Sequence, residues 1–244
     1  MTHESPVVLK ENLLSIISEM QTNSSLFVKQ PGKDFSRNRK LSFSDTIQFL
    51  LAMKGNTLRK EWMDFWDFSP DMASLPAFSQ QRAKLLPEAM DFLFHSFTDS
   101  FSSPETYRGF RLLACDGSDL AIARNPDDKS TYRRHNSIER NQQGYNQLHL
   151  NALYDLKNRI YVDAVIQPGR FPNEPGALID MMKRSKLQEP VFLIADRGYE
   201  SYNILAHAQE MGWKYIIRAK DLGSRGFSPI YLYQTAELLI VPCL

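Results

Sequence analysis

The spacing of apolar residues changes near residue 105, and this change constrains the fold more than any other feature of the sequence. In the first hundred residues, apolar side chains recur every three or four positions, which is the period of a buried helix face. Beyond residue 105, short apolar runs of strand length alternate with helical patterns. The sequence therefore predicts a mostly helical N-terminal region over residues 1–105, followed by an α/β region. The helical series are Leu9-Leu13-Ile16-Ile17-Met20, Phe43-Ile47-Leu50-Leu51 and Leu86-Met90-Leu93-Phe97-Phe101.

The order of elements after residue 105 predicts a mixed sheet with flanking helices. Ser102-Ser103-Pro104 is the expected linker, and the α/β core is expected over residues 106–220, followed by a tail over residues 221–244. Three strands come first and two helix–strand pairs follow, which is the order of ribonuclease-H-like domains. The expected strands are Phe110–Cys115, Gln147–Tyr154, Ile160–Ile166, Val191–Ala195 and Tyr215–Ala219, and the expected helices are Ala177–Lys186 and Ser201–Met211.

Composition excludes several classes of protein and favours none. The 43% hydrophobic content is enough for a packed core. The sequence has no run of about 18 uncharged apolar residues, so it predicts no membrane span. The two cysteines, Cys115 and Cys243, offer neither a disulfide framework nor metal-ligand spacing, as is typical of the cytoplasm. Residues 1–105 hold 11 basic and 13 acidic residues, whereas residues 106–220 hold 17 and 13. This mild cationic surplus permits nucleic-acid binding without indicating it.

Two aspartates occupy equivalent places in the predicted sheet. Asp116 follows the first strand directly and Asp196 follows the fourth. In the expected strand order these two strands are central neighbours, so the two carboxylates can meet, and Gly117 is expected to let the chain turn away. Oxygen ligands without a histidine or thiolate cluster suit Mg²⁺ or Mn²⁺. The alternative is structural, since an aspartate at a strand end is often a turn-former or a helix cap.

The ordered set of motifs resembles the DDE transposases of bacterial insertion sequences. The resemblance is carried by Asp116-Gly117-Ser118 and Asp196-Arg197-Gly198-Tyr199, and it covers roughly residues 30–222. The subgroup is the one whose third acid lies in a Tyr-x2-Arg-x3-Glu-x6-Lys motif. Further matching segments are His149–Asp155, Asp163–Ile166 and Ile216–Lys220, with Arg37–Phe43 and Ala77–Lys84 in the helical region.

The resemblance implies a two-metal phosphoryl transfer on DNA. Asp116 would be the ligand shared by two Mg²⁺ ions, with Mn²⁺ as a substitute, and Asp196 would hold one of them. Nothing in this sequence matches the third motif, so we expect a C-terminally truncated or frameshifted transposase whose third acidic ligand is unknown. The implied partners are the element's terminal inverted repeats, target DNA and a second copy of the chain. The implied location is the bacterial cytoplasm, with association with the nucleoid through DNA.

Several arginines are candidate DNA contacts. The loop from Arg124 to Arg140 includes Arg133 and Arg134 and can track a DNA backbone, and Arg197 can contact a phosphate. A solvated loop, partly neutralised by its own acidic residues, is an equal alternative, and Arg197 can equally be an ordinary surface arginine. Residues 1–105 are a further candidate for binding DNA ends, and His149 is expected to be a core or half-buried histidine, to which no role is assigned.

Two functions besides an impaired transposase stay open. One is a catalytically inactive DNA-binding fragment that competes with full-length transposase. The other is a ribonuclease-H-like nuclease that uses a different third ligand.

Overall fold

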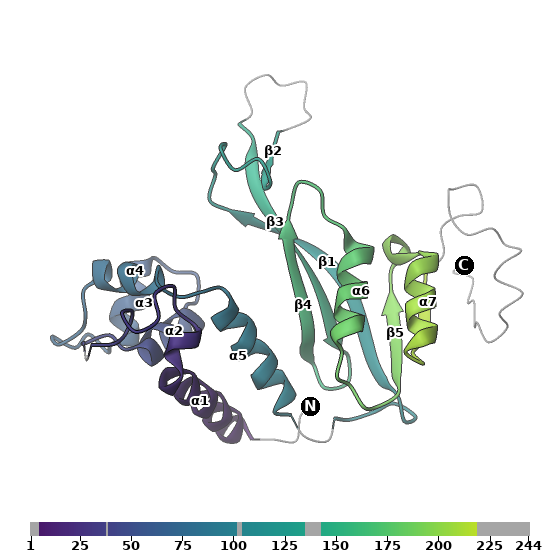
Figure 1. The fold of residues 1–244 in the computed structure, drawn as a ribbon, viewed down its shortest axis with the longest axis horizontal. Coiled ribbons are helices and arrows are strands. Elements are labelled where there is room, and N and C mark those ends of the chain that lie inside the picture. The colour runs from purple at the N-terminus through teal and green to yellow at the C-terminus, as the bar shows by residue number, and fades with distance from the viewer. Residues whose placement is uncertain (1–4, 38, 102–103, 135–142, 219–244) are drawn as a thin grey trace, which may run out of the picture. The chain divides into compact units, whose positions relative to one another are not determined.

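The computed structural model describes residues 5–37, 39–101, 104–134 and 143–218, which form two compact units divided at residues 102 and 103 (Figure 1). The expected linker residues Ser102 and Ser103, the tail from residue 221 onward and the loop residue Arg140 lie outside the described residues. Within the part described, no helix is both long and apolar enough to cross a membrane.

The N-terminal unit is helical, as the sequence predicts. It contains α1 (Pro6–Thr22), a single turn η1 (Ser24–Leu26), α2 (Phe43–Ala52), α3 (Leu58–Phe65), α4 (Leu75–Arg82) and α5 (Glu88–Asp99). Ser5 caps α1 by accepting a hydrogen bond from the backbone N–H of Val8, and Ser42 and Asp45 form a capping box on α2. The three helices expected from apolar periodicity are α1, α2 and α5. The eight-residue helices α3 and α4 were not predicted.

Two apolar clusters stabilise this unit. The first joins α1, α2 and α5 through residues such as Ile17, Ile47 and Leu93. The second is aromatic: Phe49 lies edge-on to both Trp62 and Phe78, with each pair of ring centroids 4.7 Å apart. Buried aromatic side chains are large and prefer this geometry, so even eight-residue helices can be held firmly.

The second unit is built on one six-stranded mixed sheet. Its elements are β1 (Arg111–Ile122), β2 (Tyr132–Arg133), β3 (Tyr145–Asp155), β4 (Ile160–Pro168), α6 (Glu174–Arg184), β5 (Val191–Ala195), η2 (Arg197–Tyr199), α7 (Tyr202–Glu210) and β6 (Lys214–Ile217). The strand order is β2-β3-β1-β5-β6, and β4 also pairs with β3. The pairing of β1 with β3 is antiparallel, whereas β1 with β5 and β5 with β6 are parallel. This confirms the predicted ribonuclease-H-like order of a mixed sheet.

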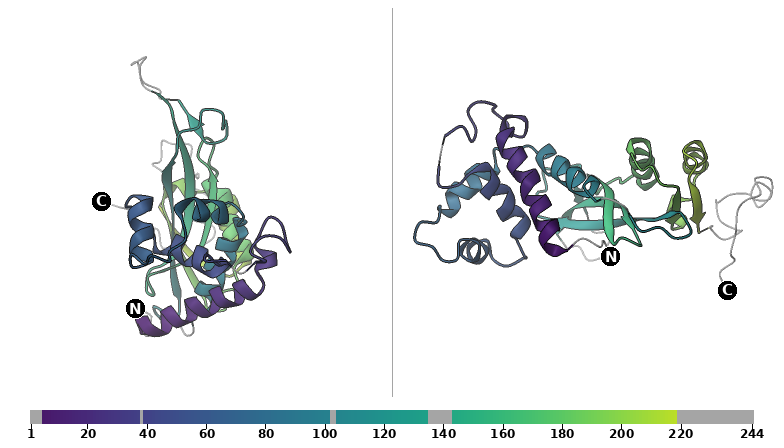
Figure 2. Two further views of the ribbon diagram at one scale, coloured as in Figure 1. Left: turned by 90° about the vertical axis from the view of Figure 1, so that its left-hand side faces the viewer. Right: turned by 90° about the horizontal axis from the view of Figure 1, so that it is seen from below.

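Helices α6 and α7 pack on one face of the sheet, as Figure 2 shows from below. Their apolar residues meet alternate residues of the central strands, including Leu113, Leu153 and Leu193. On β1 the buried positions are Arg111, Leu113 and Cys115, so residues of this parity face the helices.

Two sequence expectations about this unit are wrong in detail. The chain does not turn away at Gly117, because β1 continues to Ile122 while paired with β3. Helix α6 begins at Glu174 rather than Ala177, because Asn173 caps it by accepting a hydrogen bond from the backbone N–H of Gly176. The short strand β2 was not predicted either, since two residues are too few to show a period.

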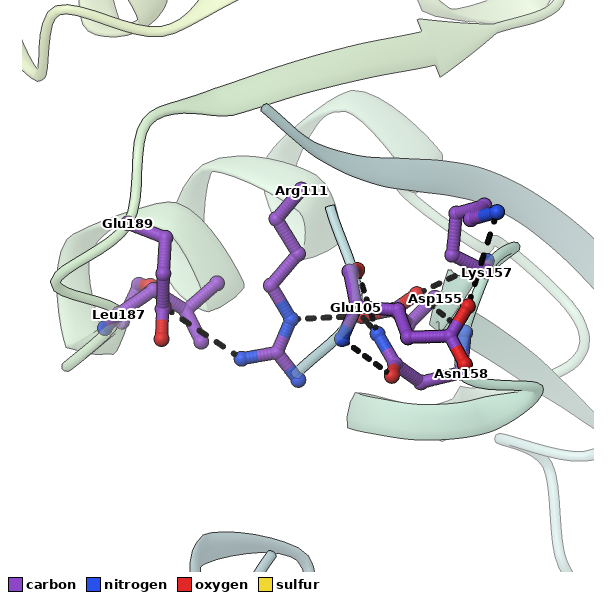
Figure 3. Close-up of polar contacts among 8 residues, drawn as sticks. Glu105, Arg111, Asp155, Lys157, Asn158, Leu187 and Glu189 are labelled. Carbon is purple, nitrogen blue, oxygen red and sulfur yellow. Dashed lines mark hydrogen bonds and ion pairs between the residues drawn. The ribbon is translucent and has the colours of Figure 1, made fainter. Parts of the chain in front are cut away.

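A buried ion pair ties the opposite end of the sheet together (Figure 3). The Asp155 side chain is fully buried, and its Oδ2 lies 2.6 Å from Nε of Arg111. Asn158 also donates to Asp155 from its side chain and its backbone, at 2.9 Å each. Glu189 lies 3.7 Å from Nη1 of Arg111. The buried charges are therefore well satisfied, and the strand ends are fixed away from the edge that carries Asp116 and Asp196.

Candidate active site

Asp116 on β1 and Asp196, which directly follows β5, lie at the same edge of the sheet, where these two strands are neighbours. In the parallel pairing of β1 with β5, Cys115 is opposite Ala195, so each aspartate directly follows a paired residue. Both aspartates are exposed. Asp116 is the first residue of β1 beyond the end of β5, and Asp196 starts the turn η2, where its carbonyl accepts from the backbone N–H of Tyr199 at 3.0 Å. The expected adjacency of the first and fourth strands is confirmed; the catalytic role stays a prediction.

The two carboxylates keep most of their acceptor capacity. Asp116 Oδ1 accepts from the backbone N–H of Gly117 at 2.9 Å. Strand alternation places Asp116 on the face opposite Cys115 and Gly117, and therefore opposite α6. An exposed carboxylate on this face is open to an incoming ligand.

Glu174, the first residue of α6, approaches the segments that carry both aspartates. A Cβ built on Gly117 would lie 2.7 Å from Oε1 of Glu174, and one built on Gly198 would lie 3.1 Å from Oε2. Both distances are shorter than ordinary van der Waals contact. The two glycines therefore leave the space that the Glu174 carboxylate occupies, and this explains why glycine stands at position 117 inside a strand.

Glu174 is the end of a polar chain that runs through a buried histidine. His149 is 6% exposed; its Nδ1 lies 2.8 Å from Oδ1 of Asp119, and its Nε2 lies 3.1 Å from Oε1 of Glu174. The second contact has an ion-pair distance without hydrogen-bond geometry, so Nε2 has no hydrogen-bond partner among the described residues. The hydrogen bond from His149 holds the pKa of Asp119 below its ordinary value. His149 is buried, as the sequence analysis expected, and it links two carboxylates.

Beneath this edge lie Cys115 and Tyr199, whose side chains have raised pKa values. Burial raises the pKa of the Cys115 thiol to about 12. Burial also raises the pKa of Tyr199, whose hydroxyl donates to Oδ1 of Asn151 at 3.1 Å. Because a thiol must lose its proton to attack, Cys115 is not a nucleophile in this arrangement.

The predicted DNA-contacting arginines fall into two places. Arg197 is exposed in η2 and follows Asp196 directly. Arg124, Arg133 and Arg134 belong to the arm formed by the ends of β1 and β3 with β2 (Figure 1). Arg124 Nε donates to the carbonyl of Gly144 at 3.0 Å, so this side chain also holds the arm together.

The described part of the arginine loop has internal order. The Asp128 carboxylate accepts from the Ser130 hydroxyl and from the Thr131 hydroxyl, both at 2.6 Å, and these bonds lower the pKa of Asp128. Both donors are neutral hydroxyls, so these bonds order the loop and do not neutralise its arginines. The roles of the four arginines toward DNA stay predictions.

A divalent cation fits the donors at this edge only in part. The donors are carboxylate oxygens, which suit Mg²⁺ or Mn²⁺ better than softer metals. Among the residues that the structure describes, however, no three histidine, cysteine, aspartate or glutamate side chains form a group that could hold a metal ion. Asp116 and Asp196 offer carboxylate oxygens at this edge, and their role as metal ligands stays a prediction.

A comparison with protein families finds that the family described as "Transposase DDE domain" matches residues 107–230, just over half of the chain. The chain belongs to this family. The matched segment includes both aspartates and every strand of the sheet. A search of curated proteins gives no match.

Two solved transposase structures are similar to this DDE-domain chain. One is a piggyBac transposase synaptic complex with hairpin DNA, with 14% identity, a TM-score of 0.48, and coverage of 96% of this chain and 54% of that chain. The other is a Drosophila P element transposase strand transfer complex, with 10% identity, a TM-score of 0.41, and coverage of 87% and 47%. The chain spans about half the length of each.

The sequence analysis missed Glu174 as a neighbour of Gly117, Gly198 and His149. Asn173-Glu174-Pro175 does carry a helix-start signal, namely a capping asparagine followed by an acid and a proline. That signal would have placed Glu174 at the N-terminus of α6. The contacts of Glu174 with Gly117 and His149 depend on how α6 packs on the sheet, and no local sequence pattern predicts this packing.

Proposed function

We propose that this DDE-domain chain belongs to a transposase that cleaves and joins DNA at the ends of an insertion sequence. The observation that carries the proposal is that Asp116 on β1 and Asp196 directly after β5 adjoin two paired strands inside the family match. The proposed substrates are the terminal inverted repeats of the element and a target DNA. Two copies of the chain are proposed to act together, because two ends must be joined.

Asp116 and Asp196 are the proposed ligands of Mg²⁺, for which Mn²⁺ can substitute. In such a centre, bound ions supply activation of the attacking oxygen and stabilisation of the leaving oxygen. Asp116, on the exposed face of β1, would be shared between two ions, and Asp196 would hold one. Arg197 would neutralise a backbone phosphate beside them, as an exposed guanidinium does in charge-assisted pairs.

The chain offers no residue at the spacing of the family's third acidic motif, so we propose that it is impaired in cleavage by itself. Glu174 approaches the segments of both aspartates, but its carboxylate lies toward His149. We therefore assign no third ligand. This incomplete set of carboxylates also favours the alternative of a catalytically inactive DNA-binding fragment. The experiment below distinguishes that fragment from an impaired transposase.

The test is DNA nicking by the purified chain with Mg²⁺ or Mn²⁺, on a supercoiled plasmid that carries the DNA flanking its gene. Asp116→Asn and Asp196→Asn should each lower nicking by at least about 100-fold, because even substitutions around metal ligands cost roughly 10–100-fold. Asp180→Asn, an exposed position on α6, is the matched control. Nicking that survives both substitutions would overturn the assignment.

Two further outcomes select the alternatives. End-specific binding without nicking, in either metal, would favour the inactive DNA-binding fragment. Metal-dependent cleavage of plasmids with or without the flanking DNA, lost on both substitutions, would favour a ribonuclease-H-like nuclease.

A further inference from the structure

The N-terminal unit contains a cavity whose lining is rich in cations. It measures about 570 Å³ and lies between the segment from Lys29 to Arg39 and the end of α4. Five of its lining residues are basic and a single one is acidic: Lys29, Lys33, Arg37, Arg39 and Lys84, with Asp34. Residues 1–105 carry more acidic than basic residues, so this gathering of cations does not reflect the composition of the region.

The single acid of the lining is already engaged. Asp34 Oδ2 accepts from the backbone N–H of Gln30 at 3.0 Å, and Oδ1 lies 3.9 Å from Nζ of Lys84. Its side chain is 9% exposed. The Asp34 carboxylate therefore stabilises the loop and adds little negative charge to the cavity lining. Within the described ranges, Lys29, Lys33, Arg37 and Arg39 have no carboxylate within 4 Å.

Backbone hydrogen bonds hold the two walls of the cavity together. The N–H of Lys29 donates to the carbonyl of Lys84, and the N–H of Leu86 donates to the carbonyl of Phe27, both at 2.9 Å. Phe35 packs edge-on against Phe43 with centroids 5.5 Å apart, and Lys84 Nζ lies 5.6 Å from the Phe35 ring centroid. The loop is thus fixed to the helices, so its cations surround a formed hollow.

Unpaired cations around a concave surface focus a positive potential and favour an anion. Arginine guanidinium groups match the geometry of phosphate oxygens in particular, and lysines add point charges. Two sequence segments without an assigned role, Arg37–Phe43 and Ala77–Lys84, are about 40 positions apart and both contribute to this lining.

We propose that this cavity binds a phosphodiester group of the DNA backbone and so serves as a DNA-anchoring site separate from the aspartate pair. This inference rests on the proposed function, which makes DNA the substrate. Phosphate contacts of this kind position a protein on a duplex and carry no sequence information directly. A free phosphate ion has the same chemistry, so the experiment must distinguish the two sources.

The experiment measures binding of the full chain to duplex DNA in EDTA, by fluorescence anisotropy over a range of salt concentrations. The test variant is Arg37→Gln/Arg39→Gln. The control is Arg59→Gln/Lys60→Gln, which removes two exposed charges from α3 in the same unit, outside the cavity lining. Thermal melting establishes that both variants are folded, and Lys33→Gln is a milder variant if the first is not.

The test variant should weaken binding about tenfold and reduce the slope of log affinity against log salt by about one, since the slope falls by about one for each phosphate that is no longer neutralised. The control should bind like the unchanged chain. Equal effects of test and control, or no DNA binding by the unchanged chain, would overturn the proposal. Binding of inorganic phosphate that is lost in the test variant, with DNA affinity unchanged in that variant, would instead show a site for free phosphate.

Failure here is distinguishable from failure of the proposed function. Loss of nicking in Asp116→Asn with cavity-dependent binding intact supports both proposals. Cavity-dependent binding by a chain that never nicks removes the nuclease assignment and leaves the anchoring site. Nicking that depends on the aspartates, with binding unchanged in Arg37→Gln/Arg39→Gln, removes the anchoring site alone.

Discussion

Gly117 is explained by the side chains that pack against it and not by a local backbone turn. A glycine after an aspartate at the end of an apolar run indicates a turn, and the sequence analysis interpreted it in that way. The strand continues instead, and the space beside Gly117 is taken by Glu174 and His149. A glycine at position 117 was informative, but it is explained by the packing of His149 and Glu174, which are 32 and 57 positions away in the sequence.

Gly117→Ala should therefore destabilise the second unit. The new Cβ would lie 2.7 Å from both Glu174 Oε1 and His149 Nε2, and the buried imidazole has little room to move. Overpacking of this kind costs about 1–3 kcal/mol. Gly198→Ala meets Glu174 alone, at 3.1 Å, and should cost less. Thermal unfolding of both variants checks the order; an equal or reversed order would contradict the contact.

Glu61 sets a pH dependence in the N-terminal unit. Its carboxylate accepts from the backbone N–H groups of Asn56 and Lys54, and the Asn56 bond contributes most to a lowered pKa. A carboxyl with a lowered folded-state pKa stabilises the fold above its unfolded-state pKa. That contribution disappears as the pH falls through the folded-state value.

The expected result is that Glu61→Gln is less stable than the unchanged chain at pH 7, and that the difference narrows toward pH 3. Denaturant unfolding at a series of pH values measures this difference. Amide hydrogen exchange at Lys54 and Asn56 gives a local readout, and both amides should exchange faster in the variant at pH 7. A stability difference that does not change with pH would count against the hydrogen-bonded carboxylate.

At the scale of elements, the sequence predicted what apolar periodicity encodes. The five-residue run Val191–Ala195 is β5 as expected, and the strand order follows from three strands and two helix–strand pairs. The neighbouring positions of Asp116 and Asp196 came from that order. Helices α3 and α4 were missed because eight residues make only about two turns, and aromatic contacts such as Phe49 with Trp62 hold them.

The buried pair of Arg111 and Asp155 fixes β1 to the end of β3. Asp155→Ala leaves the Arg111 charge with Glu189 alone, at 3.7 Å, and Arg111 is 7% exposed. Breaking a buried pair from one side costs roughly 3–5 kcal/mol. Glu189→Ala removes a longer contact to a carboxylate that is 32% exposed, and it should cost much less. Denaturant unfolding of the two variants compares them, and similar losses would show that Asp155 is not the main partner.

At the scale of the whole molecule, the two candidate sites lie in different compact units. The aspartate pair is at an edge of the sheet, and the cationic cavity lies within the helical unit. Sequence patterns placed the first site, because strand ends are visible in a sequence. They could not place the second, because its cations come from a loop and a helix end that meet only through folding.

This division predicts that binding and cutting of DNA are lost separately. Asp116→Asn should bind DNA in EDTA with unchanged affinity and lose metal-dependent nicking, because an exposed carboxylate adds nothing to phosphate binding. Arg37→Gln/Arg39→Gln should need about tenfold more protein to half-saturate nicking, with the saturated rate retained. Titrating each variant against plasmid, beside the Arg59→Gln/Lys60→Gln control, measures both quantities. A lower saturated rate in the arginine variant would mean that the cavity also positions DNA for cleavage. Binding and cleavage would then not be separable between the two units.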